Sequence, residues 1–117
     1  MKYLTADGRY WIKVKDDVAS VGLTSETLDH FGSLLVVART AGQGVYASRG
    51  MSLAAVEGVF SLGCIASPLW GTLDTISDDA EENPMAITPE TPLFTFTKYT
   101  LPDNLQLIRE NDALSFV

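Results

Sequence analysis

The chain has 117 residues, enough for one hydrophobic core but not for two, so we expect a single domain over residues 1–117. Hydrophobic residues make up 46% of the chain and charged residues 20%, a balance that excludes a wholly disordered protein. The formal net charge is −7 and the eight basic residues are scattered. The sequence therefore lacks the basic face that nucleic acid or an anionic membrane surface requires, and we expect neither as a partner.

Cysteine usage and the first residues bear on the compartment. Cys64 is the single cysteine, so the chain forms no internal disulfide and suits a reducing compartment. The opening MKYLTADGRYW reaches Asp7 and Arg9 too soon to hold the apolar core of a secretory signal peptide. We therefore expect a cytoplasmic protein.

The first third of the chain predicts a β-hairpin, a short helix and a strand. RYWIKVK alternates apolar and polar residues, DD forms a turn and VASVGL returns, so residues 10–23 are expected to form a hairpin. Thr24 or Ser25 then caps a short helix over SETLDHF, which ends at Gly32. LLVVAR at 34–39 is a continuous apolar run, typical of a buried strand.

The middle of the chain predicts further strands in a segment with almost no charge. After a loop at TAGQG, the expected strands are MSLAAVEGVF at 51–60, LGCIAS at 62–67 and, beyond a turn at PLW, GTLDTI at 71–76. The run from Gly50 to Leu73 contains one charged residue, Glu57, and is long enough to cross a bilayer. Its glycines, Pro68 and short apolar groups favour a strand–turn–strand arrangement over a transmembrane helix.

The last third predicts a strand between two polar segments. SDDAEENP at 77–84 indicates a solvated loop or a helical turn, and LFTFTKY at 93–99 alternates as a strand does. Pro102, with Asp103 and Asn104 after it, indicates a C-terminal helix over PDNLQLIREN. Short strands separated by regular turns predict a mainly β fold, a small sandwich or flattened barrel with short peripheral helices and a C-terminal helix.

Several strings, in this order, give the chain a resemblance to a known family. VASVGLTSETLDHFGSLLVV is similar to V-A-x-V-G-I-T-x-x-A-x-x-x-L-G-D-I-V, and VEGVFSLGCIASPLWGTLDTIS to V-E-S-V-K-A-x-S-D-L-x-x-P-V-S-G-x-V-x-x-V-N. YLTADGRYWIKV and ISDDAEENPMAIT resemble two further segments of the same family. The family is the H protein of the glycine cleavage system, within the lipoyl/biotinyl carrier superfamily. The resemblance runs nearly end to end and implies a lipoyl-domain-like barrel-sandwich hybrid with no enzymatic activity of its own.

The resemblance places the family's lipoate attachment position at Phe60. In the family, a lysine at the hairpin tip carries lipoate through an amide, because its amine is the nucleophile that captures the activated acyl group. Glu57 falls on the family's glutamate, Val59 on its valine and Phe60 on the lipoyl lysine. No lysine occurs between Lys15 and Lys98, so the amide cannot form at this hairpin and we expect no lipoate cofactor.

Other positions also depart from the family's pattern. Cys64 stands where the family has an aspartate, and Gly63 where it has a serine. The family's P-Y-G-x-G-W segment has no counterpart, since TPETPLFTF is several residues shorter. In the family these segments surround the lipoyl arm. The resemblance therefore implies a fold that has been kept while its carrier chemistry has been lost.

Two hypotheses of function follow. The first is a non-enzymatic, non-lipoylated H-protein-like module that docks through the hairpin at Glu57–Cys64 to partners of lipoate-dependent or glycine-cleavage metabolism. The resemblance suggests a lipoate ligase or the P or T protein of glycine cleavage as the partner, with the module itself a monomer or weak homodimer. The candidate contacts are Glu57, Val59, Phe60, Leu62 and Cys64. The second hypothesis is a carrier component of the glycine cleavage system loaded at Lys98, Lys13 or Cys64, or acting without a covalent arm.

Alternative interpretations of these residues involve packing alone. Phe60 either packs against its own hairpin or is exposed for a partner, and exposure favours docking over a purely structural remnant. Cys64 is most simply a small apolar residue within a strand, since buried cysteine is common. His30 has no second ligand at metal spacing, and the acidic residues of 78–82 lack the alternating positions of a calcium loop. We expect no catalytic, cofactor-binding or metal-binding residues.

Overall fold

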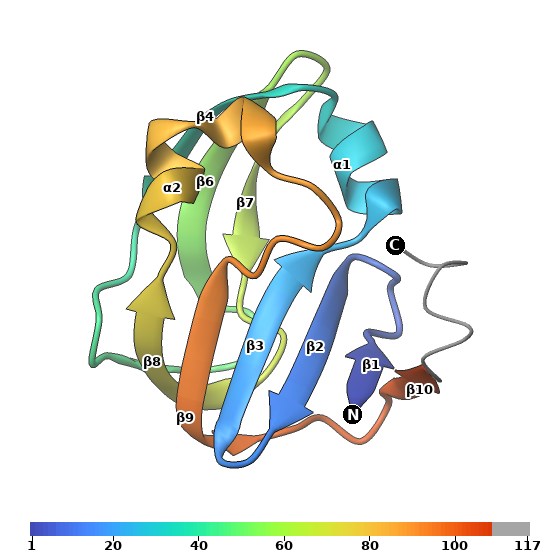
Figure 1. Cartoon of the computed structure of the whole chain (residues 1–117), viewed down its shortest axis with the longest axis vertical. Helices are drawn as coiled ribbons and strands as arrows, with labels where there is room; N and C mark the ends of the chain where they lie inside the picture. The colour runs from blue at the N-terminus through green and yellow to red at the C-terminus, as the bar shows by residue number, and fades with distance from the viewer. Residues whose placement is uncertain (109–117) are drawn as a thin grey trace.

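The computed structural model describes residues 1–108 and places their strands in two antiparallel sheets (Figure 1). The larger sheet has the order β10-β1-β2-β3-β9-β8-β5 and the smaller one the order β4-β6-β7. The strands are β1 (Lys2–Leu4), β2 (Tyr10–Lys15), β3 (Val18–Leu23), β4 (Leu34–Arg39), β5 (Tyr46–Ala47), β6 (Ser52–Gly58), β7 (Leu62–Ala66), β8 (Trp70–Ile76), β9 (Phe94–Thr100) and β10 (Gln106–Ile108). The helices are α1 (Ser25–Phe31), α2 (Asp78–Glu82) and the 3₁₀ helix η1 (Pro84–Ala86).

One hydrophobic core joins the two sheets. Ile12 and Phe96 of the larger sheet and Leu53 and Ile65 of the smaller sheet are all fully buried within it. The alternation in β2 and β9 supplies the inward side chains on one side, and alternation in β6 supplies them on the other. The fold is therefore a β-sandwich whose two sheets do not close into a barrel, as the mainly β prediction allowed.

The predicted hairpin over residues 10–23 is confirmed by β2 and β3. Its register pairs Trp11 with Gly22, and the indole of Trp11 lies across that glycine. A Cβ added to Gly22 would meet the ring at 2.2 Å, so this position has no room for a side chain. The Trp11 Nε1–H donates to the carbonyl of Pro89 at 2.6 Å. The ring thus links the hairpin to the segment that precedes β9.

Helix α1 begins and ends where the sequence predicts. The side chain of Thr24 caps it by accepting from the Thr27 N–H at 3.3 Å. Gly32 ends it at φ = 75°, in the left-handed region, and its N–H donates to the Leu28 carbonyl at 2.9 Å. Because α1 lies between β3 and β4 in the chain, it connects the larger sheet to the smaller one.

Strand β4 covers residues 34–39 as predicted, but the expectation that it is buried is wrong for most of its length. Leu34 and Val37 face the core, whereas Leu35 and Val36 are 48% and 45% exposed. β4 is an edge strand of the smaller sheet, and its side chains that point away from the core are exposed. A continuous apolar run does not reveal whether a strand is central or at an edge.

The acidic segment at 77–84 forms a helical turn, one of the two alternatives. Ser77 caps α2 by accepting from the Ala80 N–H at 3.2 Å. The guanidinium of Arg39, on β4, binds Asp78 at 2.6 Å and also contacts Glu81. α2 therefore packs beside β4.

The predicted C-terminal helix is wrong over the described residues. Residues 103–104 form a turn and β10 follows, pairing with β1 so that Lys2 faces Ile108 and Leu4 faces Gln106. Burial of Ile108 and the open edge of β1 favour a strand here over the helix that the local polar start suggested. Residues 109–111 of the predicted helix lie outside the described residues. The strands β1 and β5 are too short to have been predicted.

The charge-poor run at 50–73 forms the β6–β7 hairpin and the start of β8, which confirms the strand–turn–strand prediction. Within residues 1–108, no helix has the length and apolar character needed to cross a membrane.

The contact between Trp11 and Gly22 yields a first prediction. Gly22→Ala should lower the free energy of unfolding by about 1–3 kcal/mol, because the new methyl overlaps the indole ring. Gly42→Ala is the matched control, since the nearest atom to its added Cβ is 3.9 Å away, and it should change stability by less than about 0.5 kcal/mol. Urea denaturation of both variants measures the difference, and equal stabilities would contradict the packing described.

Candidate functional site

The tip of the β6–β7 hairpin is a four-residue turn over Gly58, Val59, Phe60 and Ser61. The strands pair Glu57 with Leu62, and the Gly58 N–H donates to the Ser61 carbonyl at 2.9 Å. No charged side chain lies within the turn, and Glu57 next to it is exposed and forms no ion pair among the described residues. The turn is therefore an apolar projection from an acidic protein.

Backbone hydrogen bonds to the segment that ends α1 hold this turn in place. The Phe60 N–H donates to the Phe31 carbonyl at 2.9 Å, and the Val59 N–H donates to the Ser33 carbonyl at 3.0 Å. Gly58 allows the approach, because a Cβ at this position would lie 2.2 Å from the Phe31 carbonyl oxygen. The turn is thus fixed by its backbone, and its side chains remain free to face outward.

The Phe60 side chain is 77% exposed. One edge of the ring lies over Gly32, whose added Cβ would be 2.7 Å from a ring carbon, but most of the ring faces solvent. Of the two arrangements considered from the sequence, the exposed one is therefore found. Val59 and Leu62 are also exposed, and we call Val59, Phe60 and Leu62 the apolar tip.

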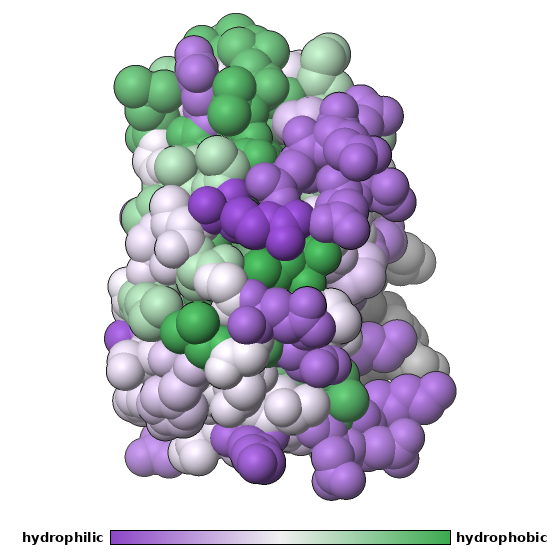
Figure 2. All heavy atoms as spheres, turned by 90° about the vertical axis from the view of Figure 1, so that its left-hand side faces the viewer, coloured by the Kyte–Doolittle hydropathy of each residue, from purple (hydrophilic) through white to green (hydrophobic). Residues whose placement is uncertain are grey.

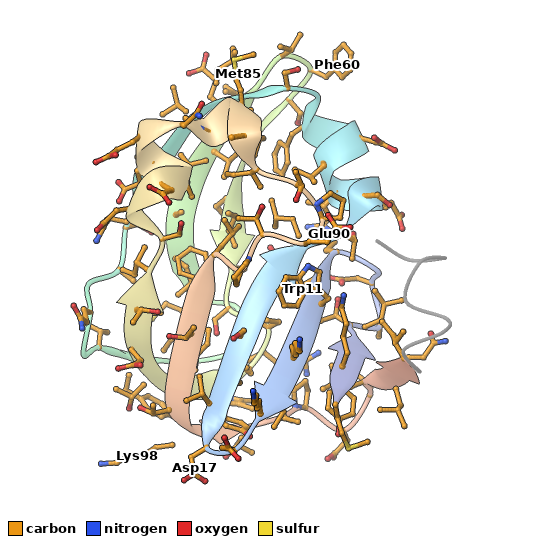
Figure 3. All side chains as sticks on the ribbon, viewed as in Figure 1. Trp11, Asp17, Phe60, Met85, Glu90 and Lys98 are labelled. Atoms are coloured by element: carbon orange, nitrogen blue, oxygen red, sulfur yellow. The ribbon has the colours of Figure 1, made fainter. Side chains whose placement is uncertain are left out.

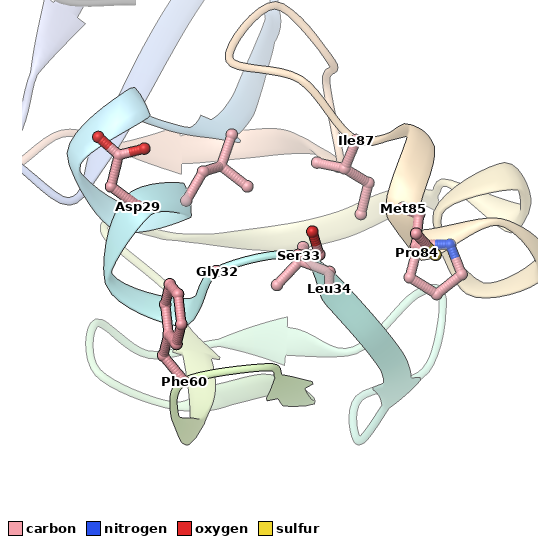
Figure 4. A pocket seen from close by; sticks show the side chains of 9 residues that line it. Asp29, Gly32, Ser33, Leu34, Phe60, Pro84, Met85 and Ile87 are labelled. Atoms are coloured by element: carbon pink, nitrogen blue, oxygen red, sulfur yellow. The ribbon is translucent and has the colours of Figure 1, made fainter.

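Hydrophobic side chains gather at the end of the molecule that carries this hairpin. Figure 2 shows them at the top of the face it views, above a band of hydrophilic residues. Phe60 and Met85 both lie at this end in Figure 3, and Met85 is 69% exposed. Between them is an open cavity of about 490 Å³ (Figure 4). Its apolar lining comes from Leu28, Leu34, Phe60, Pro84, Met85 and Ile87.

A second cavity, of about 520 Å³, lies beside β7. Tyr10 and Phe31 line it as largely buried aromatic residues, and the exposed residues Leu62, Gly63 and Cys64 of β7 form one side. Its charged residues are Asp7, Arg9 and Glu26. We call this cavity the β7 groove.

The strand assignment for Cys64 is confirmed, but its expected burial is wrong. The thiol is free and exposed on β7, because Cys64 alternates with Gly63 and Ile65, which face Phe31 and the core. His30 is also exposed, and its Nε2 lies 3.4 Å from the Ser61 hydroxyl. No sequence pattern indicates this contact, because the two residues come from separate elements. Within residues 1–108, no three His, Cys, Asp or Glu residues group closely enough to hold a metal ion.

The lysines considered as alternative attachment points do not lie at the hairpin. Lys98 is exposed in β9 at φ = 48°, next to a register shift against β8. Figure 3 places Lys98 at the end of the molecule opposite Phe60. Lys13 is exposed on β2, two residues before this strand ends at Lys15 and the chain turns into β3.

The chain matches proteins of one family. A family model described as Glycine cleavage H-protein matches residues 1–112. The mitochondrial glycine cleavage system H protein 2 of Arabidopsis thaliana is 32% identical over 84 residues, 72% of this chain and 52% of that protein. The glycine cleavage system H protein of Gloeobacter violaceus is 31% identical over 87 residues, 74% of this chain and 65% of that protein. The matched part of the chain thus spans between 52% and 65% of the length of these two curated relatives.

A solved structure has a similar fold. The crystal structure of a glycine cleavage system H protein from Mycobacterium marinum aligns with a TM-score of 0.76, covering 97% of this chain and 95% of that one. The sequence identity is 22%, so this match bears on the fold alone.

The hydroxyl of Tyr10 yields a second prediction. It accepts from the Ala66 N–H at 2.9 Å, and burial raises the pKa of Tyr10 above its ordinary value of 10.0. A raised folded-state pKa means that the stability is fully present below pH 10.0 and is lost as pH rises through the folded pKa, since the unfolded chain ionises first. Tyr10→Phe should therefore flatten the fall of the unfolding free energy above pH 10.0, measured by urea denaturation. If the unfolding free energy of Tyr10→Phe falls above pH 10.0 as steeply as that of the wild type, Tyr10 is not the group responsible.

Proposed function

Because the chain belongs to the glycine cleavage H-protein family, we propose that it is a non-enzymatic member that carries no lipoate and docks to a protein partner. The observation that carries the proposal is the exposed Phe60 at the hairpin tip, in a segment without lysine from residue 16 to residue 97. The amide that a lysine would form has no nucleophile there. What the tip offers instead is an aromatic surface.

The way the tip is held supports docking. Its backbone is fixed by the hydrogen bonds from Val59 and Phe60 to the end of α1, so binding would order only a few side-chain torsions. Burying one phenylalanine contributes roughly 1.5–3 kcal/mol, and aromatic anchors dominate many small interfaces. A projecting, preorganised aromatic residue therefore suits insertion into a pocket of a partner.

We propose that the partner belongs to lipoate-dependent or glycine-cleavage metabolism. The candidates are a lipoate ligase and the P and T proteins of glycine cleavage, as the family resemblance implies. Such a partner would offer an apolar pocket to the tip and basic residues around it, because this chain has a net charge of −7. Glu57, exposed beside the turn, is the nearest carboxylate for such a basic residue.

The alternative is a carrier loaded at a non-standard residue. Lys98 and Lys13 are exposed amines and Cys64 is an exposed thiol, so each is accessible to an acylating enzyme. Neither lysine lies on the hairpin that the family uses for its arm. We therefore favour docking, and the following experiment separates the two.

Intact mass spectrometry after incubation with a lipoate ligase, lipoate and ATP provides a third prediction. The wild-type chain should gain no lipoyl mass, whereas Phe60→Lys should gain one lipoyl group, since the variant restores the amine at the tip. Modification of the wild type would overturn the proposal, and peptide mapping would then identify Lys98, Lys13, Cys64 or another residue as the attachment point.

Calorimetric titration against each candidate partner provides a fourth prediction. Phe60→Ser should weaken binding at least tenfold, because the loss of the buried ring corresponds to about 1.4 kcal/mol or more. Tyr46→Ser is the matched control, since Tyr46 is 57% exposed but lies on β5 in the larger sheet. Equal weakening by both variants, or by neither, would contradict docking through the tip.

A further inference from the structure

The outer edge of β7 is an open strand edge. β7 is the last strand in the order β4-β6-β7. The Ala66 N–H points away from β6, because it donates to the Tyr10 hydroxyl at 2.9 Å, whereas the Ser61 carbonyl points toward β6 and accepts from Gly58. By the two-residue period of a strand, Leu62 and Cys64 direct their N–H and C=O groups outward, as Ala66 does. Within residues 1–108, the outward N–H groups of Leu62 and Cys64 have no hydrogen-bond partner, unlike that of Ala66.

In the part of the chain that the structure describes, this edge lacks the usual protection against pairing. Exposed edges are normally blunted by lysine, proline, bulges or a covering segment. Leu62, Gly63 and Cys64 are uncharged and exposed, and the register of β7 with β6 is regular along them. The opposite edge of the sheet, β4, is covered. α2 packs beside it, and the backbone N–H of Arg39 donates to the Glu81 carboxylate at 3.4 Å.

The β7 groove provides space along the open edge. Its volume is about 520 Å³, and Tyr10 and Phe31 supply an apolar floor. The Ala66 N–H already donates to the Tyr10 hydroxyl. An added strand can therefore pair with Leu62 and Cys64 but not with Ala66. These two residues offer two N–H donors, the Cys64 carbonyl and the second lone pair of the Leu62 carbonyl, whose first accepts from the Ser61 hydroxyl at 3.3 Å. Together these groups fix the register of one short extended segment.

We propose that an extended segment of a partner protein adds to β7 as a fourth strand of the smaller sheet. The charge of the groove selects the chemistry of this segment: Asp7 and Glu26 outnumber Arg9 in a chain of net charge −7, so the segment is basic. A second copy of this chain would also carry a net charge of −7, so electrostatic repulsion disfavours it as the partner. The inference does not rest on docking through Phe60, since it uses the backbone edge of β7. Leu62 belongs to both sites, with its side chain in the apolar tip and its backbone in the edge.

The open N–H of Cys64 gives a matched pair of variants. Cys64→Pro removes this N–H without breaking a hydrogen bond to β6, since the group points outward. Cys64→Ser keeps the N–H and serves as the control. Leu62→Pro tests the other outward N–H and replaces Cys64→Pro should that variant fail to fold by circular dichroism.

The probe is a phage-displayed library of random heptapeptides, selected on the full wild-type chain. We expect enriched peptides that alternate β-branched or aromatic residues with Lys or Arg. A synthetic copy should bind Cys64→Pro at least tenfold more weakly than Cys64→Ser and should lose affinity when its alternate amides are N-methylated. On binding, hydrogen exchange should slow at the amides of Leu62 and Cys64.

Three results would overturn the proposal. The first is failure to enrich any peptide, or equal binding to Cys64→Pro and Cys64→Ser. The second is binding that Phe60→Ser abolishes and Cys64→Pro leaves intact, which would support the apolar tip alone. The third is an edge that is already occupied in the free protein. Occupation by a second copy would appear as a dimer in sedimentation that Cys64→Pro dissociates. Occupation by residues 109–117 would appear as protection of the β7 amides that is lost when the chain is cut after Ile108.

Discussion

Two backbone hydrogen bonds to the segment that ends α1 determine where the candidate site lies. The carbonyls of Phe31 and Ser33 accept from Phe60 and Val59, and so attach the hairpin of the smaller sheet to the helix that enters from the larger one. The attachment requires a close approach, which Gly58 permits because it has no side chain to meet the Phe31 carbonyl. The position of the tip is thus a property of how the two sheets pack, not of the hairpin alone.

This constraint explains why an exposed aromatic residue persists on an acidic protein without being absorbed into its core. With its backbone anchored at Phe31, the ring of Phe60 reaches no further inward than the surface of Gly32. Its apolar area therefore stays in contact with water, at a free-energy cost that a binding partner would relieve. The tip and the open edge of β7 are consecutive in the chain, so one hairpin presents an apolar projection and an unpaired backbone next to each other.

Local patterns were sufficient wherever a short-range rule decides the structure. The alternation of residues 10–23 predicted the first hairpin, and Thr24 and Gly32 marked the two ends of α1 because capping involves neighbours in sequence. Such patterns failed where a distant partner decides. Residues 106–108 follow a polar turn that suggests a helix, yet they pair with β1, which is about a hundred residues earlier in the chain. The apolar run of β4 likewise gave no sign that the strand lies at a sheet edge.

The sequence by itself determined which functional groups the hairpin carries. No lysine occurs from residue 16 to residue 97, so the hairpin itself contains no side-chain amine. Only the tertiary structure decided which side chains of the hairpin meet solvent. Phe60 and Cys64 are both residue types that are often buried. Phe60 is exposed because hydrogen bonds to the end of α1 fix its turn, and Cys64 is exposed on β7, whose outer edge pairs with no strand of residues 1–108. Exposure depends on which elements pack together across the chain, and composition and spacing do not contain that information.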